Sequence, residues 1–191
     1  MRMIPTPSQT VGPFFAFGLT DDKGRVRCIA GPGAKGERVL LVCRVLDGDD
    51  APVPDAMIEV WQADADGKYN HPDDPQHKTT DPACTGFGRM GTGEDGLCEF
   101  ETIKPGRVQG PGSILQAPHL NLALFARGLL QQFYTRAYFA NDPANKEDPV
   151  LALIPEERRK TLMAQLDDRR EGRWKFEIHL QGEHETVFFD V

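Results

Sequence analysis

A two-residue alternation of apolar and polar side chains, repeated in short runs, limits the fold of this chain more than any other feature. In the clearest run, Arg173–Leu180, every second residue from Trp174 onward is apolar. Side chains of a β-strand alternate between the two faces of a sheet, so the pattern predicts a half-buried strand. Alternating or β-branched apolar runs predict further strands at Arg38–Leu46, Met57–Ala63, Leu97–Ile103, Ala117–Phe125, Tyr134–Ala140 and Glu185–Val191.

The spacing of these runs indicates a mainly β protein. Turns rich in Gly and Pro separate them, with 19 Gly and 15 Pro in 191 residues. One helix is predicted from Pro155 to about Asp167, because Pro suits a first helical position and two Glu residues follow it. We expect one domain over residues 1–191, an antiparallel β-sandwich with long loops, one late α-helix and an extended N-terminal segment (about 1–18). The polar stretch Asp64–Glu94 is expected to be a long functional loop.

Charge and cysteine usage exclude several classes of protein. The net charge of −7, with no basic run, argues against a nucleic-acid partner. No run of apolar residues has the length of a signal peptide or a membrane span, so we expect a soluble, cytoplasmic protein. The four cysteines form no Cys-x-x-Cys pair, and Cys43 and Cys98 are expected to be reduced core thiols.

The run Ala117–Phe125 carries the most informative polar residues. Its leucines occupy every second position, which places His119 and Asn121 together on the opposite face of the predicted strand. Two histidines in this arrangement would be a credible metal pair, whereas an amide is a poor ligand for a transition metal. The pattern indicates a metal site from which half of the pair has been lost.

The chain resembles the intradiol ring-cleaving dioxygenases, and in particular the α subunits of hetero-oligomeric members. The resemblance runs nearly end to end and depends on the order of several segments, each weak alone. These are Thr6–Phe15 (TPSQTVGPFF), Ile58–Tyr69 (IEVWQADADGKY), Thr102–Gly106 (TIKPG), Ala117–Gly128 (APHLNLALFARG), Tyr134–Phe139 (YTRAYF) and Gln181–Val191 (QGEHETVFFDV).

The resemblance implies a site with two of four iron ligands. Catalytic members hold Fe(III) with two tyrosinates and two histidines. The four vestigial ligand positions fall on Tyr69, Val108, His119 and Asn121, so one tyrosine and one histidine are absent, and a family arginine falls on Gln116. The remaining pair is too weak a chelate for Fe(III), so we expect no metal and no catalytic residue of its own in this chain. The Fe(III) is expected in a homologous β subunit.

The resemblance also implies a substrate and a role for the chain. The hetero-oligomer would cleave protocatechuate with O₂ to 3-carboxy-cis,cis-muconate, in aromatic catabolism by the β-ketoadipate pathway. The α chain would supply part of the wall of the partner's active site. The matching substrate-binding residues are Thr10, Gly12, Pro13, Phe14 and Arg127. A guanidinium such as that of Arg127 would favour a carboxylated catechol.

Two alternatives remain open from the residues. The chain could be an independent mononuclear iron dioxygenase that recruits His71, His77 or Tyr134 beside Tyr69 and His119. It could also be a non-enzymatic β-sandwich that binds aromatic compounds or serves assembly alone. The first alternative predicts iron in the isolated chain, and the second predicts no gain in rate when a catalytic partner is added.

Overall fold

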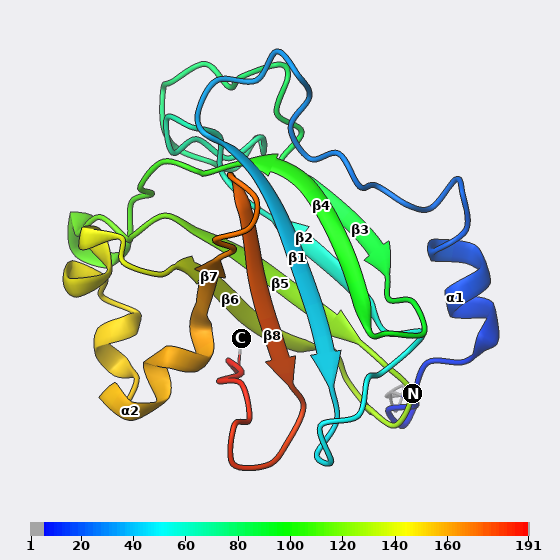
Figure 1. The fold of residues 1–191 in the computed structure, drawn as a ribbon. Helices are drawn as coiled ribbons and strands as arrows, with labels where there is room; N and C mark the ends of the chain where they lie inside the picture. The colour runs from blue at the N-terminus through cyan, green and yellow to red at the C-terminus, as the bar shows by residue number, and fades with distance from the viewer. Residues whose placement is uncertain (1–5, 191) are drawn as a thin grey trace, which may run out of the picture.

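The computed structural model describes residues 6–190, so Met1–Pro5 of the N-terminal segment and Val191 lie outside the described residues. Eight strands form most of its regular structure (Figure 1). Their bounds are β1 Arg38–Leu46, β2 Met57–Trp61, β3 Phe87–Gly91, β4 Leu97–Ile103, β5 His119–Phe125, β6 Phe133–Phe139, β7 Met163–Leu166 and β8 Arg173–His179.

The strands pair in the order β3-β2-β5-β6-β7-β8-β1-β4, which gives two layers joined by β7. β7 pairs parallel with β6 and antiparallel with β8, and so belongs to both layers. The pair β1–β8 is also parallel, and the remaining pairs of neighbouring strands are antiparallel. The predicted mainly β fold is confirmed, although its sheet is mixed and not wholly antiparallel.

The main core lies between the two layers. Leu120, Leu122 and Leu124 of β5 are buried in the same cluster as Phe100 of β4 and Phe176 of β8. Each such side chain contributes roughly 1.5–3 kcal/mol when it leaves water. Because the leucines of β5 occupy its inner face, the residues between them are directed to the outer face of this layer.

The predicted helix from Pro155 to Asp167 is wrong in its length. The α-helix α2 covers only Glu156–Arg159, with Pro155 as its N-cap, and the 3₁₀ helix η4 follows at Lys160–Leu162. The chain then turns into β7, where Met163 and Ala164 pair with the end of β6. Tertiary strand pairing outweighs the weak helical period here, because β7 is needed to join the layers.

Three other elements differ from the sequence-based expectation. The N-terminal segment contains helix α1, Pro13–Leu19, which begins with Pro at its first position. Strand β3 lies within the stretch expected to be a loop, where Arg89 pairs with Glu59 of β2. The predicted C-terminal strand is absent from the described residues, where only one bridge joins Phe189 to Tyr134. The remaining 3₁₀ helices are η1 Pro111–Ser113, η2 Pro143–Glu147 and η3 Leu151–Leu153.

Burial agrees with two further expectations. Cys43 and Cys98 are buried opposite each other on β1 and β4, as free thiols. Between residues 6 and 190, no helix has the length and apolar character needed to cross a membrane.

Phe100 tests the importance of the interlayer core. Phe100→Ala should lower the free energy of unfolding by about 3–5 kcal/mol, because it removes a fully buried ring from the cluster. Leu153→Ala is the matched control, since Leu153 is 81% exposed, and should change stability by no more than about 0.5 kcal/mol. Urea unfolding followed by circular dichroism measures both, and equal small losses would contradict the assignment of the core.

Candidate functional site

Strand β5 begins at the vestigial ligand positions. His119 and Asn121 lie two residues apart on its outer face, as expected, but His119 is only 3% exposed. Its Nδ1 lies 2.7 Å from the carbonyl oxygen of Ala117, so Nδ1 carries the hydrogen and donates it. The other ring nitrogen, Nε2, is buried without a hydrogen-bond partner among the described residues. The His119 ring is therefore neutral, and the lone pair of Nε2 faces the protein interior.

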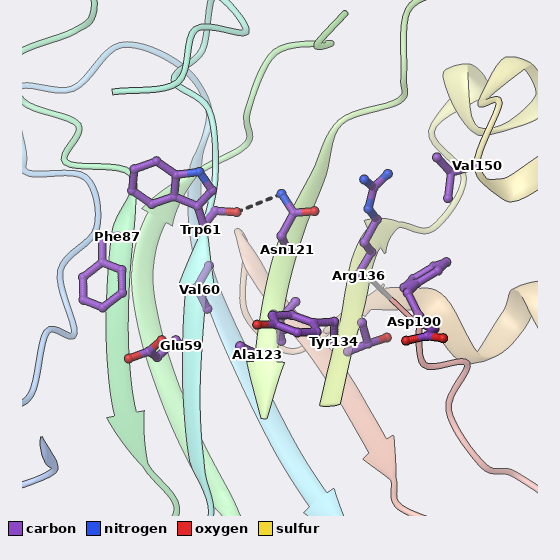
Figure 2. Close-up of a pocket in the computed structure, with 13 residues that line it drawn as sticks. Glu59, Val60, Trp61, Phe87, Asn121, Ala123, Tyr134, Arg136, Val150 and Asp190 are labelled. Atoms are coloured by element: carbon purple, nitrogen blue, oxygen red, sulfur yellow. Dashed lines mark hydrogen bonds between the residues drawn. The ribbon is translucent and has the colours of Figure 1, made fainter. Parts of the chain in front are cut away.

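Tyr69 lies directly against Asn121. The Asn121 Nδ2 group donates to the Tyr69 hydroxyl at 3.2 Å. It also donates to the Trp61 carbonyl oxygen at 3.2 Å (Figure 2). The rings of Trp61 and Tyr69 stack nearly parallel, with centroids 6.1 Å apart. Burial raises the pKa of the Tyr69 phenol, which keeps it protonated at neutral pH. Position 121 was expected to lack a metal ligand. The Asn121 amide acts there as a hydrogen-bond donor instead.

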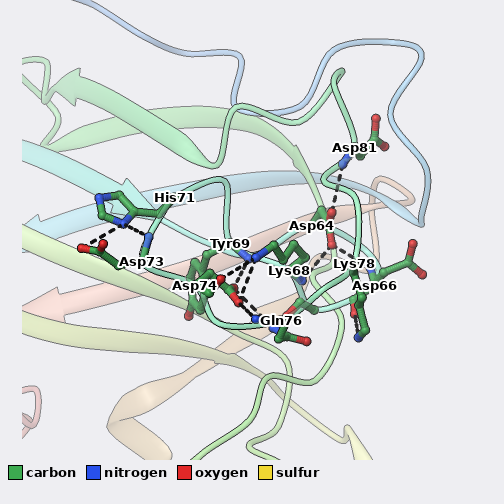
Figure 3. A network of polar contacts seen from close by, with 11 residues as sticks. Asp64, Asp66, Lys68, Tyr69, His71, Asp73, Asp74, Gln76, Lys78 and Asp81 are labelled. Atoms are coloured by element: carbon green, nitrogen blue, oxygen red, sulfur yellow. Dashed lines mark hydrogen bonds and ion pairs between the residues drawn. The ribbon is translucent and has the colours of Figure 1, made fainter.

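A polar network holds the loop that carries Tyr69 (Figure 3). The Lys68 ammonium pairs with Asp74 at 3.0 Å, and both side chains are at least nine-tenths buried. The backbone N–H of Tyr69 donates to the other carboxylate oxygen of Asp74 at 2.8 Å. Asp64 accepts hydrogen bonds from the backbone N–H groups of Asp66, Lys68 and Asp81. The loop is therefore ordered around Tyr69 by charge-assisted contacts.

Val108 completes the four vestigial positions. It lines a cavity of about 310 Å³ together with Tyr69, Trp61 and His71. The structure thus brings Tyr69, Val108, His119 and Asn121 to one end of the β5 layer, with a hydrocarbon side chain where the second tyrosine would be. The family arginine position, Gln116, is buried nearby.

Arg136 is a charged residue beside the vestigial positions that the sequence reasoning missed. It lies opposite Asn121 on β6, and its Nη1 group donates to Gln116 Oε1 at 2.7 Å and to the Tyr138 hydroxyl at 3.3 Å. Burial, together with the positive charge of Arg136, lowers the pKa of His119 to about 4. The alternation of its strand could have shown that Arg136 points outward. Its neighbours could not be predicted, because they depend on the register between strands.

Of the three alternative iron donors, His71 lines the cavity that holds Tyr69 and Val108, and the other two do not. The ring of His71 packs edge-on against Trp61, and the Tyr134 hydroxyl accepts a hydrogen bond from Gln132. His77 is exposed. In the part of the chain that the structure describes, no group of three or more His, Cys, Asp or Glu side chains is placed to hold a metal ion.

The residues matched to the substrate wall form a separate surface at the other end of β5. The Gly128 N–H, beside Arg127, donates to Thr10 Oγ1 at 2.7 Å. Phe15 of α1 packs on Phe125 with ring centroids 5.4 Å apart. Arg127 itself pairs with Asp55 at 2.9 Å, but its side chain is 71% exposed. We call this surface the N-terminal patch; its members are Thr10, Gly12, Pro13, Phe14 and Arg127, all exposed.

The N-terminal patch lies far from the vestigial positions of the same chain. His119 is the first residue of β5 and Phe125 the last, and six residue steps of a strand span roughly 20 Å. Arg127 lies beyond Phe125 and cannot reach Tyr69 or His119 along this rigid strand. A ligand in contact with Arg127 must therefore lie outside this chain's own vestigial site.

The buried state of His119 predicts a pH dependence of stability. Its folded pKa of about 4 lies below the ordinary value near 6.5, so on acidification the unfolded chain binds this proton first. The neutral ring therefore makes its full contribution to the free energy of unfolding above about pH 6.5. This contribution falls by up to roughly 3 kcal/mol as the pH approaches 4.

His119→Gln should remove that part of the acid-induced loss, measured as urea unfolding at a series of pH values. The matched control His77→Gln, at an exposed histidine, should leave the pH profile unchanged. A profile that is the same for His119→Gln and the native chain would contradict the neutral, buried state of His119.

Comparison with known proteins agrees with the fold and the segments described above. The family model described as Dioxygenase matches residues 10–182. The protocatechuate 3,4-dioxygenase α chain of Burkholderia cepacia is 45% identical, over 97% of each chain. That of Pseudomonas putida is 41% identical, over 100% of this chain and 98% of the relative. The β chain from Burkholderia cepacia is 35% identical, over 79% of this chain and 67% of its own length.

Solved structures share the architecture at lower identity. The crystal structure of 3-chlorocatechol 1,2-dioxygenase from Rhodococcus opacus 1CP superposes with a TM-score of 0.64, at 20% identity, over 94% of this chain and 68% of its own. This likeness concerns the fold alone. The family match over most of the chain and the relatives at 41% and 45% identity decide the assignment: the chain belongs to the intradiol ring-cleaving dioxygenase family.

Proposed function

We propose that this chain is the iron-free α subunit of a protocatechuate 3,4-dioxygenase, and that its β subunit carries the Fe(III). The observation that carries the proposal is the state of the four vestigial positions, of which Val108 offers no donor atom and Asn121 only a neutral amide. The α chains among its relatives, similar over nearly their whole length, support the same role. With its partner, the chain would take part in the cleavage of protocatechuate by O₂ to 3-carboxy-cis,cis-muconate.

The residues present do not fit a ferric site. Val108 offers no donor atom, and the Asn121 amide directs its NH₂ group to Tyr69 and Trp61. Burial raises the pKa of the Tyr69 phenol, which opposes the phenolate form that a ferric ligand takes. We therefore derive no catalytic step in this chain.

The N-terminal patch suits a role in a partner's active site. Phe14 is 88% exposed and Phe17 of the same helix is 69% exposed, and such apolar surface is usually covered by association. Arg127 adjoins this surface, and its planar guanidinium can form two parallel hydrogen bonds with a carboxylate. The substrate's carboxylate is the feature that separates protocatechuate from catechol, so Arg127 would act as a specificity residue in trans.

The first test compares the chain expressed alone with the chain co-expressed with the β chain of the same organism. The proposal predicts iron, visible colour and protocatechuate cleavage only when the β chain is present. A coloured, iron-containing lone chain would support the independent dioxygenase instead. A complex no more active than the β chain alone would support a role in assembly only.

Arg127→Ala should raise the KM for protocatechuate in the complex roughly tenfold or more, because a charged hydrogen bond contributes about 1.5–3 kcal/mol. The visible spectrum of the complex should stay unchanged, since Arg127 would contact the substrate and not the iron. Steady-state kinetics with protocatechuate and catechol measure the effect, and catechol should respond little. Arg170→Ala, at an exposed arginine between β7 and β8, is the matched control. An unchanged KM for protocatechuate would remove Arg127 from the substrate site.

A further inference from the structure

Asp55 and Arg127 face each other just beyond the ends of the paired strands β2 and β5. Met57 of β2 lies opposite Phe125 of β5 in the strand register. Asp55 precedes Met57 by two positions and Arg127 follows Phe125 by two, so the antiparallel pairing continues to these two residues. Asp55 Oδ2 lies 2.9 Å from Nε of Arg127. The ion pair is therefore placed by the strand register, in addition to the attraction between its charges.

The turn that carries Asp55 has an unusual backbone conformation. Asp55 has a φ of 60°, in the left-handed region that few residues other than Gly adopt. The Thr92 hydroxyl holds this turn, since it donates to the Val53 carbonyl oxygen and accepts from the Ala56 N–H, both at 2.9 Å. The Thr92 N–H also donates to the Ala56 carbonyl oxygen at 2.8 Å. A strained backbone persists only where its surroundings enforce it, and such strain is concentrated at functional sites.

The backbone of Arg127 is fixed as well. It lies in a turn in which the Leu129 N–H donates to the Ala126 carbonyl oxygen at 3.3 Å. Gly128 supplies the positive φ of 89° in this turn. The Gly128 N–H donates to Thr10 Oγ1 at 2.7 Å, which ties the turn to the N-terminal segment. Both backbone segments of the ion pair are therefore held, and only the Arg127 side chain is left to be ordered.

The ion pair occupies one side of the guanidinium and leaves another side open. Asp55 lies at Nε, and between residues 6 and 190 no other carboxylate lies within 4.0 Å of the Arg127 guanidinium. Neither Nη1 nor Nη2 donates a hydrogen bond to a residue that the structure describes. A carboxylate binds two parallel N–H groups of a guanidinium, and the edge formed by Nη1 and Nη2 offers such a pair. Asp55 thus orients the guanidinium without covering this edge.

We propose that Asp55 is a positioning residue of the dioxygenase, which holds Arg127 so that its Nη1–Nη2 edge faces the substrate's carboxylate in the partner's active site. The inference rests on the proposed function, because it requires Arg127 to contact the substrate in trans. The Arg127 side chain is 71% exposed, so without Asp55 it would lose more rotamer freedom on binding an anion. An ion pair that orders the side chain in advance reduces that loss.

The sign of the change in KM separates positioning from plain electrostatics. The negative charge of Asp55 repels the carboxylate of the substrate, so electrostatics alone predicts that removal of this charge lowers the KM. Positioning predicts that removal raises the KM, because the Arg127 side chain must then be ordered by the substrate itself. The two explanations therefore give opposite results for the same substitution.

Asp55→Gly in the α/β complex is the test, because Gly adopts a φ of 60° without strain. The KM for protocatechuate should rise roughly three- to tenfold. The kcat and the visible spectrum should stay unchanged, and the KM for catechol, which has no carboxylate, should change little. Asp50→Gly is the matched control, since Asp50 is exposed, has a φ of 59° and lies on the same connection between β1 and β2. It should leave the KM for protocatechuate unchanged.

A double-mutant cycle shows whether Asp55 acts through Arg127. In the Arg127→Ala background, Asp55→Gly should change the KM no further, whereas a general structural role would add the same factor in both backgrounds. If Arg127→Ala raises the KM but Asp55→Gly leaves it unchanged or lowers it, the positioning role is overturned and the proposed function stands. If Arg127→Ala has no effect on the KM, the proposed substrate role of Arg127 is overturned, and the role of Asp55 with it.

Discussion

The burial of alternate leucines of β5 is the constraint on which the rest of the structure depends. Because Leu120, Leu122 and Leu124 must face the interlayer core, His119, Asn121 and Ala123 face the other way. The register with β2 and β6 then sets which side chains meet on that outer face. One packing requirement thus positions the vestigial ligand residues and, through the length of the strand, sets the distance to the N-terminal patch.

The length of β5 separates the vestigial ligand positions at its start from the N-terminal patch beyond its end. The loop around Tyr69 is well ordered, with a buried Lys68–Asp74 pair and a stacked Trp61. Val108 offers no donor atom, and the Asn121 amide donates to Tyr69 and Trp61. The exposed N-terminal patch keeps a cation and apolar side chains on the surface. Under the proposed function, such a chain would lack a complete metal centre and would complete the centre of its partner chain.

Much of the fold could be predicted because strands with two-residue alternation carry their own signal, and β1 and β4 have the predicted bounds. The short α2 and the strand β7 could not, because pairing with Tyr138 and Phe139 decides that segment. The vestigial positions came from the resemblance, and the structure places them together. Arg136 and the depth of His119 could not be found from the sequence, since both depend on which strands become neighbours. Nothing in the sequence around Arg136 distinguishes it from an ordinary surface arginine.

The most direct test of the account is the iron content of the purified α/β complex, counted per pair of subunits. Metal analysis with quantitative amino-acid analysis of each chain gives that ratio without reference to activity. We expect one iron atom per α/β pair, with the same content when the α chain carries His119→Ala. Two iron atoms per pair, or loss of iron with that variant, would show that this chain holds a metal centre of its own and would contradict its assignment as an iron-free subunit.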